Sequence, residues 1–233
     1  MSNEKCIWME AGVVEYQLCP LKKNCDVCDF HEEMIRGCRF QERSEGRILL
    51  TRKPDATLSQ FQPGLQYLNG HFWYKRVGDK RIRIGIDNFL WQLFTSVHKV
   101  VFPQNGGQIV ANQCFCWMLL SGGMIYVKTP FSGKIQNINP RFMGENLFAS
   151  QLYLEPDNEL WLLELETFDE KLIPSLSREL YLQGVDQDCS KFGQMFHTED
   201  DSEGDQSCKI LTNPRNDFRK YLQIVSDGKL FIC

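Results

Sequence analysis

The residues with the clearest chemical potential are cysteines near the N-terminus. Five of the chain's ten cysteines lie in the first forty residues. Cys25 and Cys28 form a Cys-x-x-Cys pair, which can direct two thiolates at one metal ion with little loss of chain entropy. Cys19 precedes this pair by five intervening residues, and Cys38 follows it by nine. We therefore predict a tetrahedral metal site formed by Cys19, Cys25, Cys28 and Cys38.

The identity of the metal and the full ligand set stay open. Cys6 and His31 are reserve ligands for the same site. Thiolates suit either zinc or an iron–sulfur cluster, and spacing does not separate the two. Buried free thiols in a small helical head, or redox-active disulfides, are the alternatives to a metal. A head this small buries little surface, so it needs a metal ion or contact with the rest of the chain to be ordered.

Other residue types give no sign of catalysis. The four histidines stand at positions 31, 71, 98 and 197, and no short constellation of acid–base groups surrounds any of them. The sequence has no nucleophile elbow, phosphate-binding loop or His-Glu-x-x-His motif. His71 is expected to pack or to form hydrogen bonds. We expect a protein that is not an enzyme.

Two β-hairpins are expected in the middle of the chain. In the first, alternating runs over 72–77 and 80–86 flank Gly78-Asp79, which suits a two-residue turn. In the second, a strand-like run over 114–120 reaches Ser121-Gly122-Gly123 and returns as another strand. The paired glycines supply the positive φ that a tight hairpin needs.

A short helix and a sharp corner accompany these hairpins. Asp87 is a favourable N-cap residue, and Phe89 and Leu93 follow at helical spacing. The corner is Thr129-Pro130-Phe131-Ser132-Gly133, and a further strand is expected over 134–138. Together with the hairpins, these elements describe a compact β-rich unit.

This order of elements resembles the H protein of the glycine cleavage system, a lipoyl-domain fold. The resemblance runs from near Tyr67 to about Glu166. Besides the corner, it rests on three motifs, His71-Phe72-Trp73, Ile84-Gly85-Ile86-Asp87-Asn88-Phe89 and Leu160-Trp161-Leu162-Leu163-Glu164-Leu165. It implies a mostly β (α+β) fold, in which small antiparallel sheets form a sandwich (a barrel-sandwich hybrid) with short helices.

The resemblance also implies a carrier function, but the sequence lacks the residue that this function needs. H proteins carry a lipoyl arm on a lysine at a hairpin tip. When the two are aligned without gaps on the Thr-Pro-Phe-Ser-Gly corner, that position falls on Gly122. The acidic residue that the family has before the lysine is Leu119 here. Glycine has no amine to acylate, and Lys128 lies too far down the returning strand to replace the tip lysine. Lipoate is therefore not expected.

Three functions follow from these observations. The first is a protein-interaction or scaffold role, in which the apolar hairpin tip at Leu119, Leu120 and Gly122 contacts a partner protein or the Cys-rich head. Contiguous exposed apolar surface is costly, which favours such a contact. The second is a redox, electron-transfer or sensor protein that uses the N-terminal cysteines. The third is a lipoyl carrier in glycine cleavage that uses a displaced acceptor such as Lys128.

Composition limits partners and location. The apolar fraction of 42% and the aromatic fraction of 12% suffice for a packed core. A net charge of −4 argues against nucleic-acid binding. No apolar run reaches membrane-spanning length and no secretory segment is recognisable, so we expect a cytoplasmic protein that does not bind membranes. Its cysteines should then be reduced, metal-bound or buried.

The chain divides into five expected segments. A Cys-rich head covers 1–45, a linker 46–64 and the H-protein-like domain 65–182, with an acidic flexible linker over 183–208 and a tail over 209–233. The acidic run Glu199–Asp205 and the scarcity of apolar residues favour the second linker. A helix is expected over 168–182, where Pro174 must start it or kink it.

Overall fold

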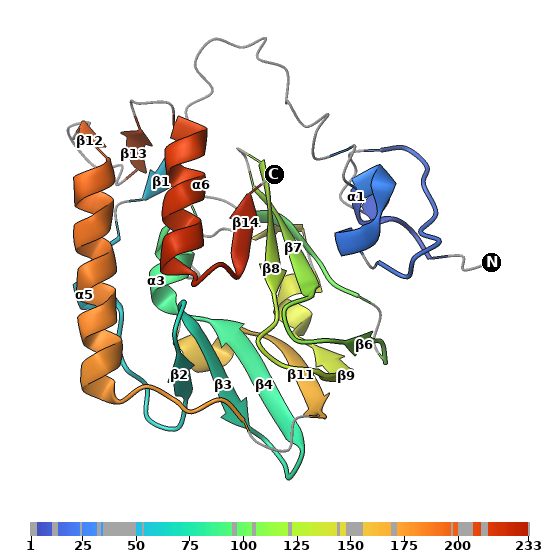
Figure 1. Ribbon diagram of the computed structural model, residues 1–233, viewed down its shortest axis with the longest axis horizontal. Helices are drawn as coiled ribbons and strands as arrows, with labels where there is room; N and C mark the ends of the chain where they lie inside the picture. The colour runs from blue at the N-terminus through green and yellow to red at the C-terminus, as the bar shows by residue number, and fades with distance from the viewer. Residues whose placement is uncertain are drawn as a thin grey trace.

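A computed structural model gives the fold of the chain (Figure 1). The statements below concern the residues that it describes. These are 4–10, 14–23, 25–31, 34, 50–52, 54–94, 97–103, 106–120, 123–143, 145–147, 156–168, 172–196, 198–199, 207–210 and 214–232.

Two antiparallel sheets make up the body of the molecule. The six-stranded sheet has the order β2-β3-β4-β11-β9-β6. Its strands are β2 (Gln66–Leu68), β3 (Phe72–Arg76), β4 (Arg81–Ile86), β11 (Trp161–Thr167), β9 (Gly133–Ile138) and β6 (Gln108–Ile109). The five-stranded sheet has the order β10-β5-β7-β8-β14. Its strands are β10 (Glu145–Leu147), β5 (Val97–Val101), β7 (Cys114–Leu120), β8 (Gly123–Lys128) and β14 (Leu230–Ile232).

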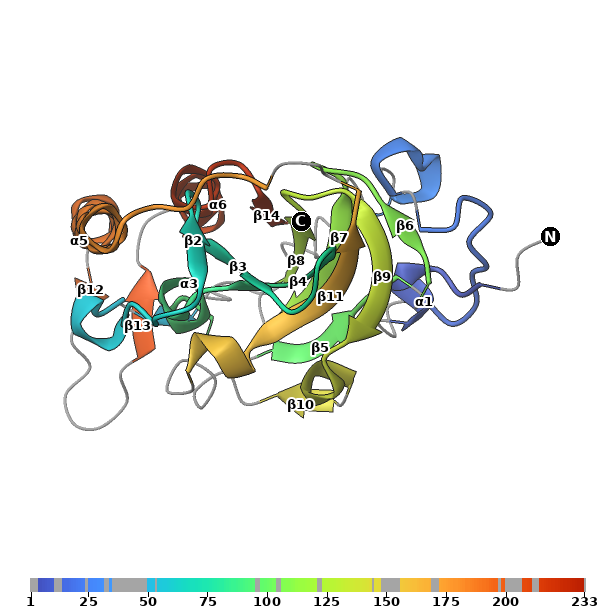
Figure 2. The same ribbon diagram turned by 90° about the horizontal axis from the view of Figure 1, so that it is seen from below.

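A small third sheet and several helices flank this body. The small sheet contains β1 (Leu50–Arg52), β13 (Ser207–Ile210) and β12 (Thr198–Glu199). The α-helices are α1 (Ile7–Glu10), α3 (Asn88–Gln92), α5 (Arg178–Met195) and α6 (Pro214–Val225). Short 3-10 helices cover Cys25–Val27, Ala56–Leu58, Pro140–Met143 and Asp157–Glu159. Figures 1 and 2 place α5 and α6 on one side of the sheets and the N-terminal head with α1 on the opposite side.

One continuous apolar core joins the two large sheets. Phe72 and Ile84 come from the six-stranded sheet, and Phe115 and Ile125 from the five-stranded sheet; all four are at most 1% exposed. Burying such side chains contributes about 1.5–3 kcal/mol each. The mostly β fold, a sandwich of antiparallel sheets with short helices, is as the sequence indicated.

The two predicted hairpins and the short helix are present. β3 pairs with β4 around the Gly78-Asp79 turn, and β7 pairs with β8 up to the pair Leu120↔Gly123. Asp87 caps α3, where its Oδ1 accepts a hydrogen bond of 3.2 Å from the Leu90 N–H. Gly122 lies outside the described residues. Local turn and capping chemistry determines the two hairpins and α3.

The C-terminal third differs from the prediction. The acidic flexible linker over 183–208 is wrong for residues 183–195, which belong to α5. α5 also begins later than the helix predicted over 168–182, because Ser177 caps it by accepting from the Leu180 N–H at 3.2 Å. Tyr181, Val185 and Phe192 recur at helical spacing and are buried. This apolar stripe packs the helix against the core. The prediction missed it because it used the average composition of the segment and not the spacing of its apolar residues.

The segments predicted as a linker and a tail also hold regular structure. The linker over 46–64 contains β1, and the Asp55 N–H donates to Gln92 of α3 at 2.6 Å. The tail over 209–233 contains α6 and β14, and β14 pairs with β8 in the five-stranded sheet. Backbone hydrogen bonds to the body therefore order both segments.

Within the described part of the chain, no helix is both long and apolar enough to span a membrane.

Candidate functional site

The β7–β8 hairpin is where the family resemblance places its functional tip, and its two faces differ. Met118 and Ile125 face the central core. The alternate residues Trp117 and Met124 lie on the outer face and are 0% and 2% exposed. Because strand residues alternate in direction, a second layer must cover this outer face.

The N-terminal head is that second layer. One apolar cluster contains Val101, Trp117 and Met124 of the sheet together with Cys6, Ile7, Trp8, Cys19 and Cys25 of the head. Figure 1 shows the head beside β7, on the side away from α5. The head therefore gains its order from contact with the sheet, as a segment of its size requires.

Lys23 ties the head to the sheet, and another hydrogen bond lies within the head. The buried Lys23 ammonium donates to both Glu10 carboxylate oxygens at 3.0 Å, and to the Phe102 carbonyl oxygen just after β5 at 3.0 Å. The Trp8 indole N–H donates to His31 Nδ1 at 3.1 Å. His31 must therefore be unprotonated at Nδ1. Its ring also meets the ring of Tyr126 on β8 edge-on, with centroids 6.3 Å apart.

The free edge of the hairpin is covered by the C-terminal strand. Leu230 and Ile232 of β14 lie opposite Val127 and Ile125 of β8. Lys128 is the last residue of β8, at the end away from the tip, and its N–H donates to the Lys229 carbonyl oxygen at 2.8 Å. This strand addition satisfies backbone groups that an edge strand would expose.

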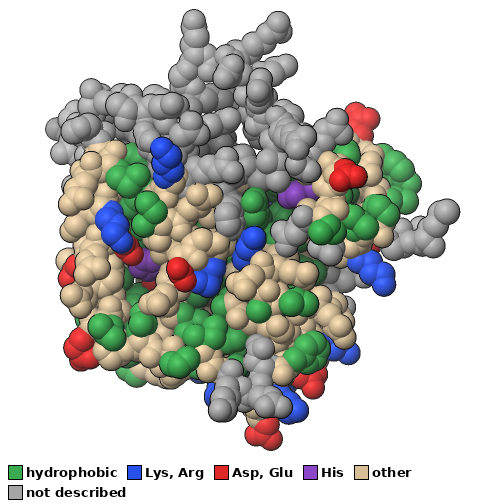
Figure 3. All heavy atoms as spheres, in the orientation of Figure 1, with side chains coloured by type: hydrophobic (Ala, Val, Ile, Leu, Met, Phe, Trp, Pro, Cys, Tyr) green, Lys and Arg blue, Asp and Glu red, His purple; other side chains and the backbone are tan. Residues whose placement is uncertain are grey.

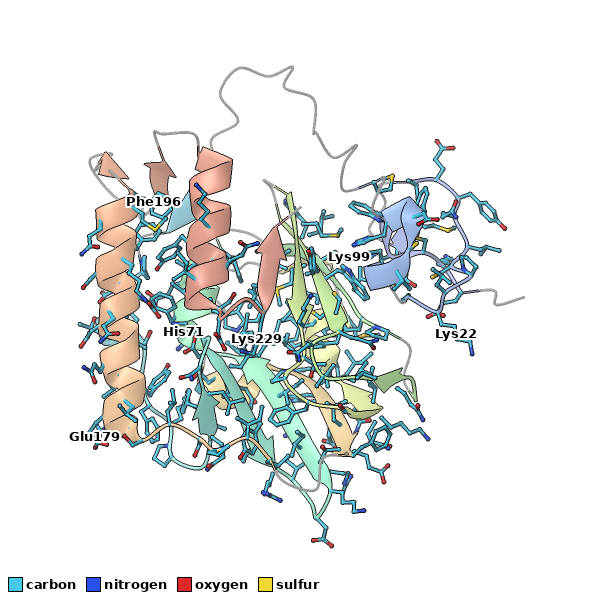
Figure 4. All side chains as sticks on the ribbon, in the orientation of Figure 1. Lys22, His71, Lys99, Glu179, Phe196 and Lys229 are labelled. Atoms are coloured by element: carbon cyan, nitrogen blue, oxygen red, sulfur yellow. The ribbon has the colours of Figure 1, made fainter. Side chains whose placement is uncertain are left out.

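Among the three residues predicted for interaction, the structure describes the side chain of Leu119 alone. Leu119 is half-buried and lies on the outer face, opposite Met124 of β8 and Lys99 of β5. Figure 4 labels Lys99 on the side of the sheet that faces the head. The backbone of Leu120 pairs with Val97 and Gly123. Nothing is described for the Leu120 side chain or for Gly122. The predicted interaction role of these three residues stays a prediction.

The head brings several of the predicted thiols together. Cys6, Cys19 and Cys25 are buried and Cys28 is half-buried, and all four are free thiols. Cys19 Sγ accepts a hydrogen bond of 3.0 Å from the Lys23 N–H. Burial raises the pKa of the Cys6 thiol, and the neighbouring Cys19 and Cys28 raise it further.

The metal prediction receives no support from this arrangement. Within the described ranges, no three His, Cys, Asp or Glu side chains are placed to hold a metal ion. Cys38, the fourth predicted ligand, lies outside those ranges. Cys6 lies near Cys19 because Lys5 and Leu18 form an antiparallel bridge. The set Cys19, Cys25, Cys28 and Cys38, with zinc or an iron–sulfur cluster, stays a prediction.

A second candidate site centres on His71, at the turn between β2 and β3. Its Nδ1 lies 2.8 Å from an Asp87 oxygen, and its Nε2 lies 3.1 Å from an Asp188 oxygen. The Tyr181 hydroxyl donates to the same Asp87 oxygen at 3.0 Å. The imidazole stacks on Phe89 with centroids 4.1 Å apart. Figure 4 labels His71 between α5 and the strands.

This environment favours the charged imidazolium. Burial by itself would lower the pKa of His71, but the negative charges of Asp87 and Asp188 and their hydrogen bonds outweigh it and raise the pKa to about 9. The pKa of Asp188 is lowered: burial opposes this, but hydrogen bonds from His71 and Lys191 prevail. His71 also has a φ of 63°, which is uncommon for a residue with a side chain.

A hollow opens beside His71. Its volume is about 460 Å³, and it lies between the β2–β3 turn and α5. Leu68, Leu176 and Leu180 form an apolar part, and Asn69, Gln183 and Gln187 provide carboxamides. His71, Tyr181 and Asp188 are its ionisable groups. Hydrogen bonding at His71 was expected from the sequence, but Asp188 was not, because position 188 was assigned to a linker.

Comparison with known proteins identifies relatives of half of the chain. The H protein of the glycine cleavage system from Mycobacterium avium is 26% identical over 118 residues, which cover 51% of this chain and 87% of the relative. The H protein from Geobacillus is 29% identical over 118 residues, which cover 48% and 85%. No model of a protein family matches the chain.

A solved structure is also similar. It is a crystal structure of a glycine cleavage system H protein from Mycobacterium marinum. It matches with a TM-score of 0.44 and 16% identity, over 53% of this chain and 99% of that chain.

Proposed function

Since half of the chain is homologous to glycine cleavage system H proteins, we propose that this protein is a relative that carries no lipoate and acts as a protein-interaction module. The proposal has two parts. One concerns the missing arm, and the other concerns the surface that binds a partner.

The observation that carries the proposal is the enclosure of the β7–β8 hairpin. The head covers its outer face and β14 covers its edge. The aligned attachment position is Gly122, which offers no amine. Lys128 is held between two strands by its backbone, at the far end of β8. A swinging arm needs an amine at a projecting tip, so this arrangement supports a binding role over a carrier role.

The partner surface is the end of the hairpin together with the adjoining head. Leu119, Leu120 and Gly122 contribute the hairpin part. An apolar patch beside a polar rim is typical of protein-binding surfaces. The partner is a protein, and the module has no catalytic group of its own in this proposal.

Intact mass tests the first part. The protein is co-expressed with a lipoate ligase and supplied with lipoate, and the H protein from Mycobacterium tuberculosis serves as the positive control. We expect the control to gain the mass of one lipoyl group and this chain to gain none. A lipoyl adduct on any lysine, including Lys99 or Lys128, would refute the proposal.

Partner recovery tests the second part. Proteins that are cross-linked in cells to the tagged chain are compared between the wild type, Leu119→Ser and the control Val110→Ser. Val110 is an aliphatic residue that is 53% exposed and lies outside the hairpin. We expect Leu119→Ser to lose a cross-linked protein that Val110→Ser retains. Equal recovery in all three would count against a hairpin interface.

The alternative function, a redox, electron-transfer or sensor protein, would use the cysteines of the head. Three buried thiols share one cluster, and backbone N–H groups point at Cys6 and Cys19 sulfurs. Metal analysis and visible absorption of protein prepared without oxygen decide this alternative. A colourless, metal-free, folded protein would end it.

A further inference from the structure

The hollow between α5 and the β2–β3 turn contains an unusual glycine. Gly184 lies inside α5 and lines the hollow, and a Cβ built on it would meet nothing within 4 Å. Glycine in a helix costs about 1 kcal/mol relative to alanine. No close packing explains this glycine, and its effect is to leave the wall of the hollow open.

The ionisable groups around the hollow carry an excess of negative charge in their buried part. Asp87 and Asp188 both contact His71, so two carboxylates face one imidazolium. Asp157 accepts a hydrogen bond of 2.8 Å from the Tyr67 hydroxyl. Burial and the nearby Asp87 raise the pKa of Asp157, so its charged form is disfavoured and the excess charge lies on Asp87 and Asp188 alone. A buried negative charge without a full counter-charge attracts a cation.

The chain already places an ammonium group on this charge. Lys191 Nζ donates to the second oxygen of Asp188, and its side chain is 45% exposed. Asp188 is only 13% exposed, so it keeps its need for a cation, whereas the half-exposed Lys191 ammonium can return to water when another ammonium takes its place. In Figure 3 basic and acidic side chains lie close together on the left of the view, where Figure 1 places α5.

The opposite part of the hollow suits an aliphatic chain. Leu68 is buried, Leu176 is half-buried, and Leu180 is 56% exposed. The exposed side chains of Asn69, Gln183 and Gln187 also line the hollow. Leucine side chains together with a carboxylate match a ligand with an aliphatic stem and a cationic end.

From these observations we propose that the hollow binds an aliphatic primary amine, with its stem along the three leucines and its ammonium on Asp188 in place of Lys191. The chemistry fits two sources, a lysine side chain of another protein or a free diamine. This site is separate from the hairpin, so amine binding here does not depend on the proposed function of the hairpin.

Calorimetric titration of the full chain tests the ligand class. The probes are 1,5-diaminopentane and Nα-acetyl-lysine amide, with 1-pentanol and pentanoate as neutral and anionic controls. We expect both amines to bind and both controls to fail. The tighter of the two amines assigns the source. Equal binding of 1-pentanol, or no amine binding tighter than about 10 mM, would overturn the proposal.

Matched variants test the location. Gly184→Leu fills the hollow, whereas Gly193→Leu makes the same change at the other α5 glycine with open space, which does not line the hollow. We expect at least tenfold weaker amine binding for Gly184→Leu and less than twofold change for Gly193→Leu. Lys191→Ala removes the competing ammonium and should strengthen amine binding severalfold. Unchanged affinity in Gly184→Leu would place the amine elsewhere and refute the site.

Discussion

At the level of single residues, buried side chains depend on specific neighbouring charges and on close packing. His71 is the clearest case, because a buried imidazolium is stable only while carboxylates face both of its nitrogens. Gly85 is a second case, because the neighbouring ring leaves no room for a side chain there. Each case predicts a measurable change in stability.

His71 predicts a loss of stability at alkaline pH. Its pKa is about 9 in the folded protein and near 6.5 in the unfolded chain. A raised pKa stabilises the fold fully below about pH 6.5, and this contribution is lost as the pH rises through about 9. We expect the urea-derived free energy of unfolding, measured with a reductant present, to fall by about 1–3 kcal/mol over this window.

Asp188→Asn is the control for that window. It removes one of the two carboxylates, so the folded pKa of His71 should fall and the pH-dependent loss should shrink. A variant that retains the whole pH dependence would show that other groups cause it.

Gly85 predicts a steric effect in the six-stranded sheet. A Cβ at this position would lie 2.5 Å from Cζ2 and 2.6 Å from Cε2 of Trp73. The Trp73 ring is buried, and its N–H is bonded to the Ile86 carbonyl oxygen at 3.1 Å, so it has little freedom to move. We expect Gly85→Ala to lower the free energy of unfolding by about 1–3 kcal/mol in urea titrations.

Gly78→Ala provides the comparison. Gly78 lies in the first hairpin turn, and an added Cβ would meet only the flexible Arg81 side chain, at 3.2 Å. Its effect should stay within about 0.5 kcal/mol. If the two alanine variants lost equal stability, the Trp73 contact would not be the cause.

At the level of whole elements, the head and β14 behave as parts of the sheet that they cover. The head supplies an apolar layer for β7 and β8, and β14 supplies hydrogen bonds for the edge of β8. Both interactions join segments that are far apart in the sequence. The free energy of docking therefore depends on a few contacts between each of these elements and the sheet.

The Lys23 contacts predict how tightly the head docks. Lys23→Ala removes the buried ammonium that links Glu10 to the Phe102 carbonyl oxygen. We expect hydrogen–deuterium exchange of residues 4–31 to become faster, corresponding to about 1–3 kcal/mol of lost docking free energy.

Lys22→Ala is a matched control for this experiment. Lys22 precedes Lys23, has a φ of 49° against 61°, and is exposed on the head (Figure 4). Because the two positions share the same backbone strain, only the buried contacts differ. Faster exchange in both variants would assign the effect to the backbone.

Across the whole molecule, three parts of the chain share one body. The H-protein-like half contributes most of the two large sheets, the head covers one face, and α5, α6 and β14 occupy the other side (Figure 1). Each cover hides apolar surface of the central half. Removal of a cover should therefore affect solubility and association as well as stability.

Removal of residues 1–45 tests this organisation. The truncated chain would expose Trp117 and Met124, which are 0% and 2% exposed in the complete chain. We expect stronger binding of a hydrophobic dye and self-association in sedimentation, with the full chain as the control. A truncated protein that stays monodisperse and binds no more dye would indicate that the head is not a required cover.

The sequence alone determined the local features. Alternation and turn glycines predicted both hairpins, and Asp87 predicted the start of α3. These features depend on nearest neighbours along the chain, where sterics and capping act regardless of distant residues. The same local reasoning failed for residues 183–195, because the acidic composition that follows position 185 outweighed the apolar positions Val185 and Phe192, which continue the helical spacing from Tyr181. The missing amine at Gly122 stays a prediction from the aligned corner.

Only the tertiary structure decided which distant segments meet. It placed the head on β7 and β8, with Cys6 beside Cys19, and it brought Asp188 to His71 across 117 positions of sequence. Such contacts depend on the packing of all elements together, because an apolar face can pack against many other apolar faces and the complete fold selects one of them. Turn and strand patterns do not encode which distant segments pack together, so the covered hairpin and the hollow beside His71 form only in the folded chain.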